Sequence, residues 1–223
     1  PKKGLLLEEF LQGRELSIDS FVSPEGEVYH SPVVELVAAE DIGIQDYHVF
    51  ARMVPARFEP SQVAAIEGIA EEGIRALRLI NSPAHIDMVY TPMGPKILEV
   101  GARVGGYRSE MIKLSFGIDL DEVAFSTSLG KGGDLVPKFE RSAAVLEFFP
   151  PREGVLKGIA GLRGVRMLES FHRLRERMRS GERIGLARQG YRCPLFVVLN
   201  HEDGSLVRRD MEEARRIITI EVG

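Results

Sequence analysis

Residues 85–106 read HIDMVYTPMGPKILEVGARVGG, and this stretch decides the fold. Apolar β-forming residues flank the short run Pro92-Met93-Gly94, whose glycine can adopt a positive φ. The pattern therefore predicts a β-hairpin with a three-residue loop, in which Thr91 pairs with Pro95.

Counting outward from that loop sets Asp87 directly opposite Glu99. Side chains opposite one another on one face lie about 5 Å apart, and like charges there repel, so a bridging cation would stabilise the pair. Arg103 follows four residues after Glu99, where the strand gives way to a glycine-rich loop. Two carboxylates, a guanidinium and glycines that permit close approach suit a magnesium polyphosphate. The alternative is surface charge on an exposed face of the sheet.

Composition limits the classes of function that the chain can have. The 223 residues are 44% hydrophobic, enough for a sizeable core, and the net charge of −4 disfavours a broad contact with nucleic acid or an anionic membrane. The single cysteine, Cys193, excludes an internal disulfide and fits a reducing compartment. Glu8 and Glu9 end the apolar run of residues 5–7 too early for a signal peptide, so we expect a cytoplasmic protein.

Extended and helical patterns alternate along the chain. Strands are predicted at residues 5–7, 16–22, 28–37, 50–55, 143–149, 191–199 and 218–222, and helices at residues 61–78, 109–116, 120–130 and 209–217. Ser61 is of the residue type that caps helices. Residues 130–134 read GKGGD, which predicts a boundary between one unit at 1–134 and another at 135–223.

Two blocks of the sequence together resemble the ATP-grasp enzymes. The first, residues 7–17, reads LEEFLQGRELS and is similar to the hinge of that family; the second is the stretch from Asp87 to Gly106, similar to its strand pair with two metal-binding acids. The chain looks like the C-terminal half of a carboxylate–amine ligase of the L-amino acid ligase type, with biotin carboxylase and glycinamide ribonucleotide synthetase as more distant relatives. The resemblance implies an α+β fold, in which a C-terminal ATP-grasp subdomain with an antiparallel sheet flanked by helices precedes a small α/β module.

The resemblance assigns the hinge block to the nucleotide. Glu8 and the backbone from Glu9 through Phe10 to Leu11 would face the adenine, with Phe10 as apolar cover, and Glu15 would accept hydrogen bonds from the ribose hydroxyls. An extended backbone can read an adenine edge without a charged side chain. The alternative is a solvated acidic strand end leading into an ordinary hairpin.

The second block carries the metal and the transferred phosphoryl group, by the same resemblance. Asp87 and Glu99 would hold Mg²⁺ (or Mn²⁺), and Arg103 matches the arginine that contacts the phosphoryl group. The chain departs from the family at Asp87, where glutamate is usual, and at Gly101, where asparagine is common. The aspartate is still a hard oxygen ligand, whereas the glycine removes an amide ligand of a second ion.

The other histidines and the arginine-rich segment give weaker indications of function. His30, His48, His172 and His201 lack metal-ligand spacing with one another or with Cys193, so zinc is not expected. A basic cluster predicts a solvated face or contact with an acidic partner; it comprises Arg173, Arg175, Arg177, Arg179 and Arg183, interleaved with Glu176 and Glu182.

Three functions from different classes stay open. The first is the catalytic portion of an ATP-dependent carboxylate–amine (or thiol) ligase, acting through an acyl-phosphate on small-molecule carboxylate and amine substrates. It would be inactive alone, because the chain begins near the hinge and the N-terminal half or a partner subunit would supply the remaining phosphate contacts. The second is a non-catalytic nucleotide-binding module, and the third an assembly domain; self-association to a homodimer is open in each case.

Overall fold

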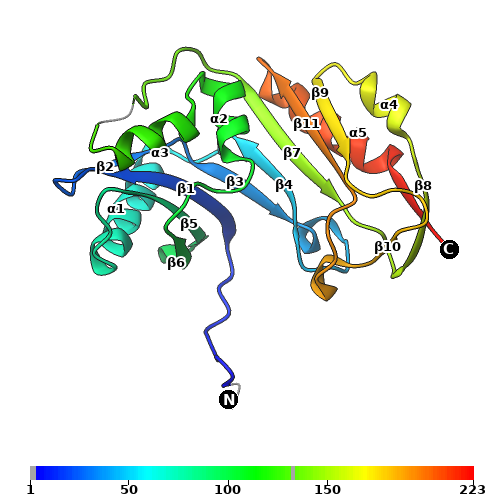
Figure 1. Cartoon of the computed structure of the whole chain (residues 1–223), viewed down its shortest axis with the longest axis horizontal. Coiled ribbons are helices and arrows are strands. Elements are labelled where there is room, and N and C mark those ends of the chain that lie inside the picture. The colour runs from blue at the N-terminus through cyan, green and yellow to red at the C-terminus, as the bar shows by residue number, and fades with distance from the viewer. Residues whose placement is uncertain (1–3, 132–133) are drawn as a thin grey trace.

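The computed structural model describes residues 4–131 and 134–223, and its centre is one large antiparallel sheet (Figure 1). Within the described residues the sheet has nine strands in the order β6-β5-β1-β3-β4-β7-β11-β9, with β2 paired to β1. The strands are β1 (Arg14–Val22), β2 (Val28–His30), β3 (Val34–Ala38), β4 (Val49–Val54), β5 (Ser82–Thr91), β6 (Gly94–Gly101), β7 (Ser142–Phe148), β9 (Phe171–Glu176) and β11 (Leu195–His201). This is the antiparallel sheet flanked by helices that the resemblance implied.

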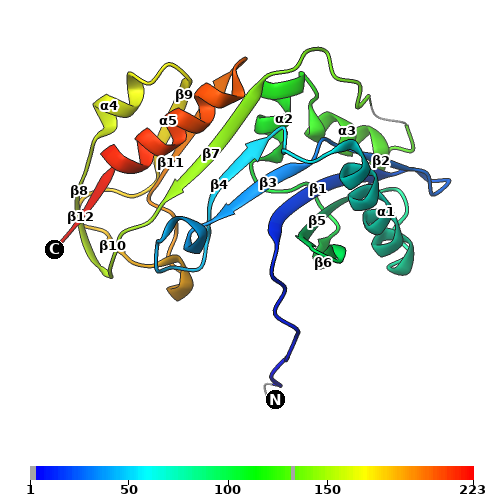
Figure 2. The same cartoon turned by 180° about the vertical axis from the view of Figure 1, so that it is seen from behind.

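Helices cover both faces of the sheet because its central strands are apolar on both sides. On β7, Ala143 and Val145 belong to the core beneath α2 (Arg108–Phe116) and α3 (Leu120–Ser128). Their neighbours Ala144 and Leu146 belong to the core beneath α5 (Gly204–Ile217). The helix α1 (Pro60–Ala76) lies on the same side as α5, over the β1–β5–β6 end of the sheet (Figure 2).

A second, three-stranded sheet lies in the C-terminal part of the chain. It pairs β8 (Gly154–Ala160) with β10 (Arg183–Ile184) on one side and with β12 (Thr219–Val222) on the other. The short helix α4 (Leu162–Arg166) follows β8, and single 3₁₀ turns lie at Glu40–Ile42 and Ala187–Gln189. None of the helices described is long and apolar enough to cross a lipid bilayer.

The predicted units 1–134 and 135–223 share the main sheet. The strand β4 of the first unit pairs with β7 of the second, with Ala51 opposite Leu146. The small sheet, in contrast, lies wholly in the second unit. Gly132 and Gly133 of the predicted boundary lie outside the described residues, and the division stays a prediction.

The β5–β6 hairpin has a shorter loop than predicted and reaches the predicted acid pair by another route. Thr91 pairs with Gly94 rather than with Pro95, so the loop has two residues and the predicted pairing near the turn is wrong by one. A β-bulge at Leu98 then inserts one extra residue into β6, and Asp87 lies opposite Glu99 after all.

Three other local predictions are wrong. Residues 5–7 form no strand but precede β1 as an exposed, extended segment that leaves the body of the protein (Figure 1). The strand predicted at residues 28–37 is broken into β2 and β3 around Pro32, which has no N–H to donate to a ladder. The cap of α1 is Glu59 rather than Ser61, with Pro60 at the first helical position, where its missing N–H costs nothing.

Candidate functional site

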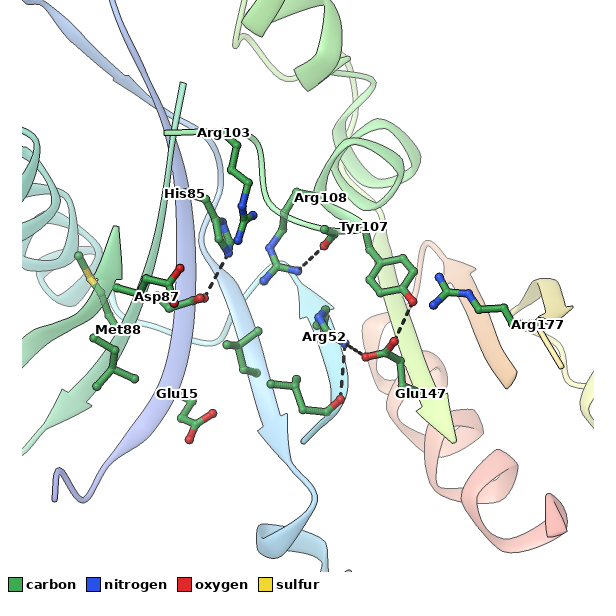
Figure 3. A pocket seen from close by; sticks show the side chains of 15 residues that line it. Glu15, Arg52, His85, Asp87, Met88, Arg103, Tyr107, Arg108, Glu147 and Arg177 are labelled. Carbon is green, nitrogen blue, oxygen red and sulfur yellow. Dashed lines mark hydrogen bonds and ion pairs between the residues drawn. The ribbon is translucent and has the colours of Figure 1, made fainter. Parts of the chain in front are cut away.

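A cleft of about 760 Å³ opens on the face of the main sheet that carries α2 and α3. Side chains from six strands, from the loop after β6, from the first residue of α2 and from the segment after β9 line it (Figure 3). Its charged residues are four acids, Glu15, Asp87, Glu99 and Glu147, and four arginines, Arg52, Arg103, Arg108 and Arg177. Balanced but clustered charge of this kind suits a ligand that carries both a polyphosphate and a cation.

The two predicted metal-binding acids lie at one end of this cleft. Asp87 on β5 and Glu99 on β6 are register partners and both line the cleft, with Leu98 brought to the same side by the bulge. Burial alone would raise the pKa of the Asp87 carboxyl, but His85 and the charges of Arg108 and Arg103 lower it below its usual value. Asp87 is therefore held as a carboxylate, the form that binds a hard divalent cation.

These two oxygen donors fit a magnesium ion only in part. The described residues contain no group of three or more His, Cys, Asp or Glu side chains placed to hold a metal. Mg²⁺ is commonly bound by one or two carboxylates together with phosphate oxygens and water, so Asp87 and Glu99 match the protein's share of such a site. The chemistry of the pair thus suits a metal that arrives with a polyphosphate.

A buried histidine connects Asp87 to a second carboxylate that sequence reasoning did not single out. His85 Nδ1 lies 3.2 Å from Asp19 Oδ1, and His85 Nε2 lies 3.3 Å from Asp87 Oδ1. The same Asp19 oxygen accepts a 2.7 Å hydrogen bond from the backbone N–H of Gly105. Although burial alone would lower the pKa of His85, its hydrogen bonds to Asp19 and Asp87 raise it. Asp19 thereby fixes both the ring beside Asp87 and the glycine loop.

Arg108 forms the floor of this end of the cleft. Its guanidinium donates to Ser17 Oγ from Nη2 at 2.6 Å and from Nε at 3.1 Å. The other carboxylate oxygen of Asp19 has no hydrogen-bond partner among the described residues, and it lies 3.9 Å from Arg108 Nε. Burial lowers the pKa of Arg108 to about 10, against the opposing charge of Asp19. Asp19, Ser17 and Glu15 alternate along β1, which is the signal in the sequence that places them on one face.

Arg103 lies at the exposed rim of the same end. Its Nη1 donates to the Val104 carbonyl at 3.2 Å, and it forms no ion pair within 4.0 Å in the described part of the chain. A Cβ built on Gly101 would lie 3.6 Å from the Arg103 side chain. This is an ordinary van der Waals distance, so the Arg103 side chain lies beside position 101 and leaves room for a Cβ there.

The opposite end of the cleft is built on an aromatic ring. Tyr107 donates to Glu147 Oε1 at 2.8 Å, and Arg52 Nη1 lies 2.8 Å from Glu147 Oε2. The guanidinium carbon of Arg177 lies 5.4 Å from the centre of the Tyr107 ring, within range of a cation–π contact. Sequence reasoning missed this group, because Arg52 and Glu147 meet only through the pairing of β4 with β7, nearly a hundred residues apart.

The hinge residues divide into one that reaches the cleft and four that do not. Glu15 lines the cleft near Asp87, and burial together with the charges of Asp41 and Asp87 raises its pKa. The others lie outside, in the segment before β1, where Glu8, Glu9 and Phe10 are exposed and Leu11 is half-buried. Their predicted contact with adenine stays a prediction.

The loop between β3 and β4 holds another histidine, His48, whose Nδ1 lies 3.6 Å from Asp46 Oδ2. His48 is buried against Phe149, with 4.6 Å between the ring centres, and neither ring nitrogen has a hydrogen-bond partner in the described structure. Asp46 beside it accepts backbone hydrogen bonds from Ala187 and Arg188, which fastens this loop to the segment before β11.

Comparison with known proteins bears on the fold. No family model matches the chain. An uncharacterised protein, y4rH, from Sinorhizobium fredii is 26% identical over 157 residues, which are 66% of this chain and 32% of that protein.

Solved structures are more informative. The L-amino acid ligase from Bacillus licheniformis is similar with a TM-score of 0.83 and 21% identity, over 96% of this chain and 53% of that one. Phosphoribosylglycinamide synthetase from Anaerococcus prevotii gives a TM-score of 0.74 and 15% identity, over 96% and 55%. N5-carboxyaminoimidazole synthetase from Staphylococcus aureus, complexed with ADP, gives 0.66 and 14%, over 94% and 52%.

The chain therefore has the fold of the C-terminal ATP-grasp subdomain, as the resemblance implied. It spans about half the length of these solved chains and about a third of the curated relative.

Proposed function

We propose that this chain is the nucleotide- and metal-binding portion of an ATP-dependent carboxylate–amine ligase. One observation carries the proposal: Asp87 and Glu99 are register partners in a cleft that also contains Glu15, Arg103 and Arg108. Paired carboxylates with flanking guanidiniums are what a magnesium nucleotide requires from a protein. The proteins of similar fold include an L-amino acid ligase and an enzyme in complex with ADP.

In this proposal each polar side chain of the cleft has a separate task. Asp87 and Glu99 hold Mg²⁺, which when bound supplies neutralising charge at the phosphates. Arg103, at the open rim, contacts the γ-phosphoryl group as it passes to a substrate carboxylate. The products of that step are an acyl-phosphate and ADP; the amine then attacks the acyl carbon, phosphate leaves, and the amine loses a proton. His85, Asp19 and Arg108 keep the glycine loop and Asp87 in place.

The remaining nucleotide contacts come, in the same proposal, from a further segment or a partner subunit. The extended residues before β1 leave the body of the protein (Figure 1), and none of those described lines the cleft. We accordingly expect this chain alone to bind the nucleotide weakly. The phosphates would stay exposed to water in the complex and would make few contacts with the protein.

A non-catalytic nucleotide-binding module is the second candidate. It is favoured by Gly101, which offers no side-chain ligand for a second ion. The two candidates differ in turnover and not in binding. A protein that includes this chain and the missing contacts would bind ADP in both cases, but only the ligase would release phosphate in the presence of an acid and an amine.

Calorimetric titration of ADP with and without Mg²⁺ tests the nucleotide and metal site on which both candidates depend. We expect magnesium-dependent binding that Glu99→Gln and Asp87→Asn each weaken by about tenfold or more, a loss of at least about 1.4 kcal/mol. Glu202→Gln changes an exposed acid outside the cleft and is the matched control, with no expected effect. Equal affinity in all four proteins, or no binding of ADP at about 10 mM, would refute the proposal.

A further inference from the structure

The basic cluster of the sequence separates into two kinds of arginine in the structure. Arg173 on β9 forms a two-pronged contact with Glu110 of α2, and Arg183 on β10 pairs with Glu153. These two are neutralised by acids from other elements, as expected of structural ion pairs.

The other arginines of the cluster gather around a separate groove. Arg175, Arg177 and Arg179 line a hollow of about 900 Å³ between β9 and β8, and Arg192 joins them from the segment before β11. In the described part of the chain none of the four forms an ion pair within 4.0 Å. Among the described residues that line the groove, Glu176 is the only acid.

Backbone hydrogen bonds hold this groove in shape. Leu156 of β8 donates to the Glu182 carbonyl and accepts from the Gly181 N–H, both at 2.9 Å. The Arg177 N–H donates to the Pro194 carbonyl at 2.7 Å. The Glu182 carboxylate accepts from the backbone N–H of Arg179, so it is engaged there and leaves the guanidinium free.

Four guanidiniums line one hollow that contains a single acid, on a chain whose net charge is −4. Like charges that face one hollow repel, and this repulsion ends when an anion binds between them. Guanidinium forks match the oxygens of carboxylate and phosphate groups. Because the chain as a whole is acidic, a small anion inside the groove suits this arrangement better than a long polyanion across the surface.

Arg177 connects the groove to the cleft, since it lines both. Its guanidinium carbon lies 4.6 Å from the centre of the Phe196 ring and 5.4 Å from that of Tyr107, and Figure 3 shows the side chain pointing toward Tyr107. An occupant of the groove therefore lies next to the aromatic end of the cleft, whereas Asp87 lies at the other end (Figure 3).

We propose that the groove binds the distal anionic group of the substrate whose reacting end lies in the cleft. The substrate then carries, besides its reacting carboxylate or amine, at least one further carboxylate or phosphate group. This inference rests on the proposed ligase function for the identity of the occupant. The groove as a site for small anions stands on its own contacts.

The test titrates two probes into the full chain at low ionic strength, citrate for the carboxylate arm and pyrophosphate for the phosphate arm. We expect at least one probe to bind at or below about 1 mM and the double variant Arg179→Gln/Arg192→Gln to weaken it by about tenfold or more. The tighter probe identifies the anionic group. Arg166→Gln removes an exposed arginine of α4 outside the groove and should leave the affinity unchanged.

Three results would overturn the assignment. The first is no binding of either probe at about 10 mM, and the second is that Arg166→Gln weakens binding as much as the double variant does. The third is that a short single-stranded RNA binds more tightly than both probes and that the double variant abolishes this binding. Binding of magnesium ADP, measured in the same proteins, separates this proposal from the previous one. Both groove substitutions should leave it unchanged, because neither residue lines the cleft. A parent that binds citrate but not magnesium ADP would refute the ligase and with it the identity of the occupant, while the anion site would stand.

Discussion

The two adjacent glycines after Arg103 offer a sharp test of how tightly the site is packed. A Cβ built on Gly105 would lie 2.6 Å from Arg108 Cγ and closer still to the His85 ring, whereas one built on Gly106 meets nothing within 4 Å. Real Cβ atoms do not approach other atoms this closely, so in Gly105→Ala the ring, the arginine or the loop must move. His85, Arg108 and Gly105 are buried, although other residues of the loop are exposed.

The cost follows from these contacts. Overpacking a filled interior costs about 1–3 kcal/mol. If the loop moves instead, the 2.7 Å hydrogen bond from Gly105 to Asp19 is lost, at about 1–3 kcal/mol. Alanine also lowers the conformational entropy of the unfolded chain, which stabilises each variant by about 0.4–1 kcal/mol. We therefore expect Gly105→Ala to lower the free energy of unfolding by about 2 kcal/mol and Gly106→Ala to leave it equal or slightly raised.

Urea unfolding followed by far-UV circular dichroism measures this difference, since the chain contains no tryptophan. With a slope of about 2 kcal/mol per molar urea, the midpoint of Gly105→Ala should fall about 1 M below that of Gly106→Ala. Equal midpoints, or a lower one for Gly106→Ala, would show that the His85–Gly105–Arg108 contact is not packed as described.

Three further predictions concern charge. Asp19→Asn leaves the buried Arg108 and His85 without their shared acid, so thermal unfolding should show a loss of stability of about 3 kcal/mol. Asp121→Asn, at an exposed acid, is the control and should cost less than about 1 kcal/mol. Similar losses in the two variants would contradict a buried pairing. Burial lowers the pKa of His48 although Asp46 and Glu147 oppose this, so its contribution to stability is present above about pH 6.5 and is lost as the pH falls through the lower folded value. His48→Gln should thus flatten the decline of Tm on acidification from about pH 7, and an unchanged slope would contradict the pKa shift. Removal of Mg²⁺ with a chelator should weaken ADP binding by about tenfold in the parent and much less in Glu99→Gln; equal effects in both would place the metal elsewhere.

Local patterns were sufficient for much of the fold. Helices were predicted at α1, α2, α3 and α5, and strands at β1, β4 and β7. Pairings between distant strands, such as β4 with β7, leave no local signal, so neither the continuity of the sheet nor the contact of Arg52 with Glu147 was foreseen. The strands β8 and β9 were also missed. The sequence of β9 is rich in arginine, which suggests a solvated segment rather than a strand.

The sequence singled out some residues of the candidate site and not others, for a physical reason. Asp87, Glu99 and Arg103 lie within one hairpin and the loop that follows, so a short stretch of sequence fixes their relation. Asp19 could have been found, since it continues the alternation of Glu15 and Ser17 along β1. In the basic cluster, only the fold reveals that Arg173 has a partner on α2 and that Arg175 has none within the described residues.

The extra residue at Leu98 separates two properties that a hairpin usually couples, the length of its turn and the placement of its side chains. A residue inserted between Pro92 and Met93 would lengthen the turn and leave the acids facing each other, because the ladder beyond the bulge is unaffected. Deletion of Leu98 would rotate Glu99 toward the α1 side, since each single-residue slip exchanges the two faces of a strand. In distant relatives, the length of this turn should therefore vary, while the spacing between the bulge and the carboxylate of Glu99 should stay the same.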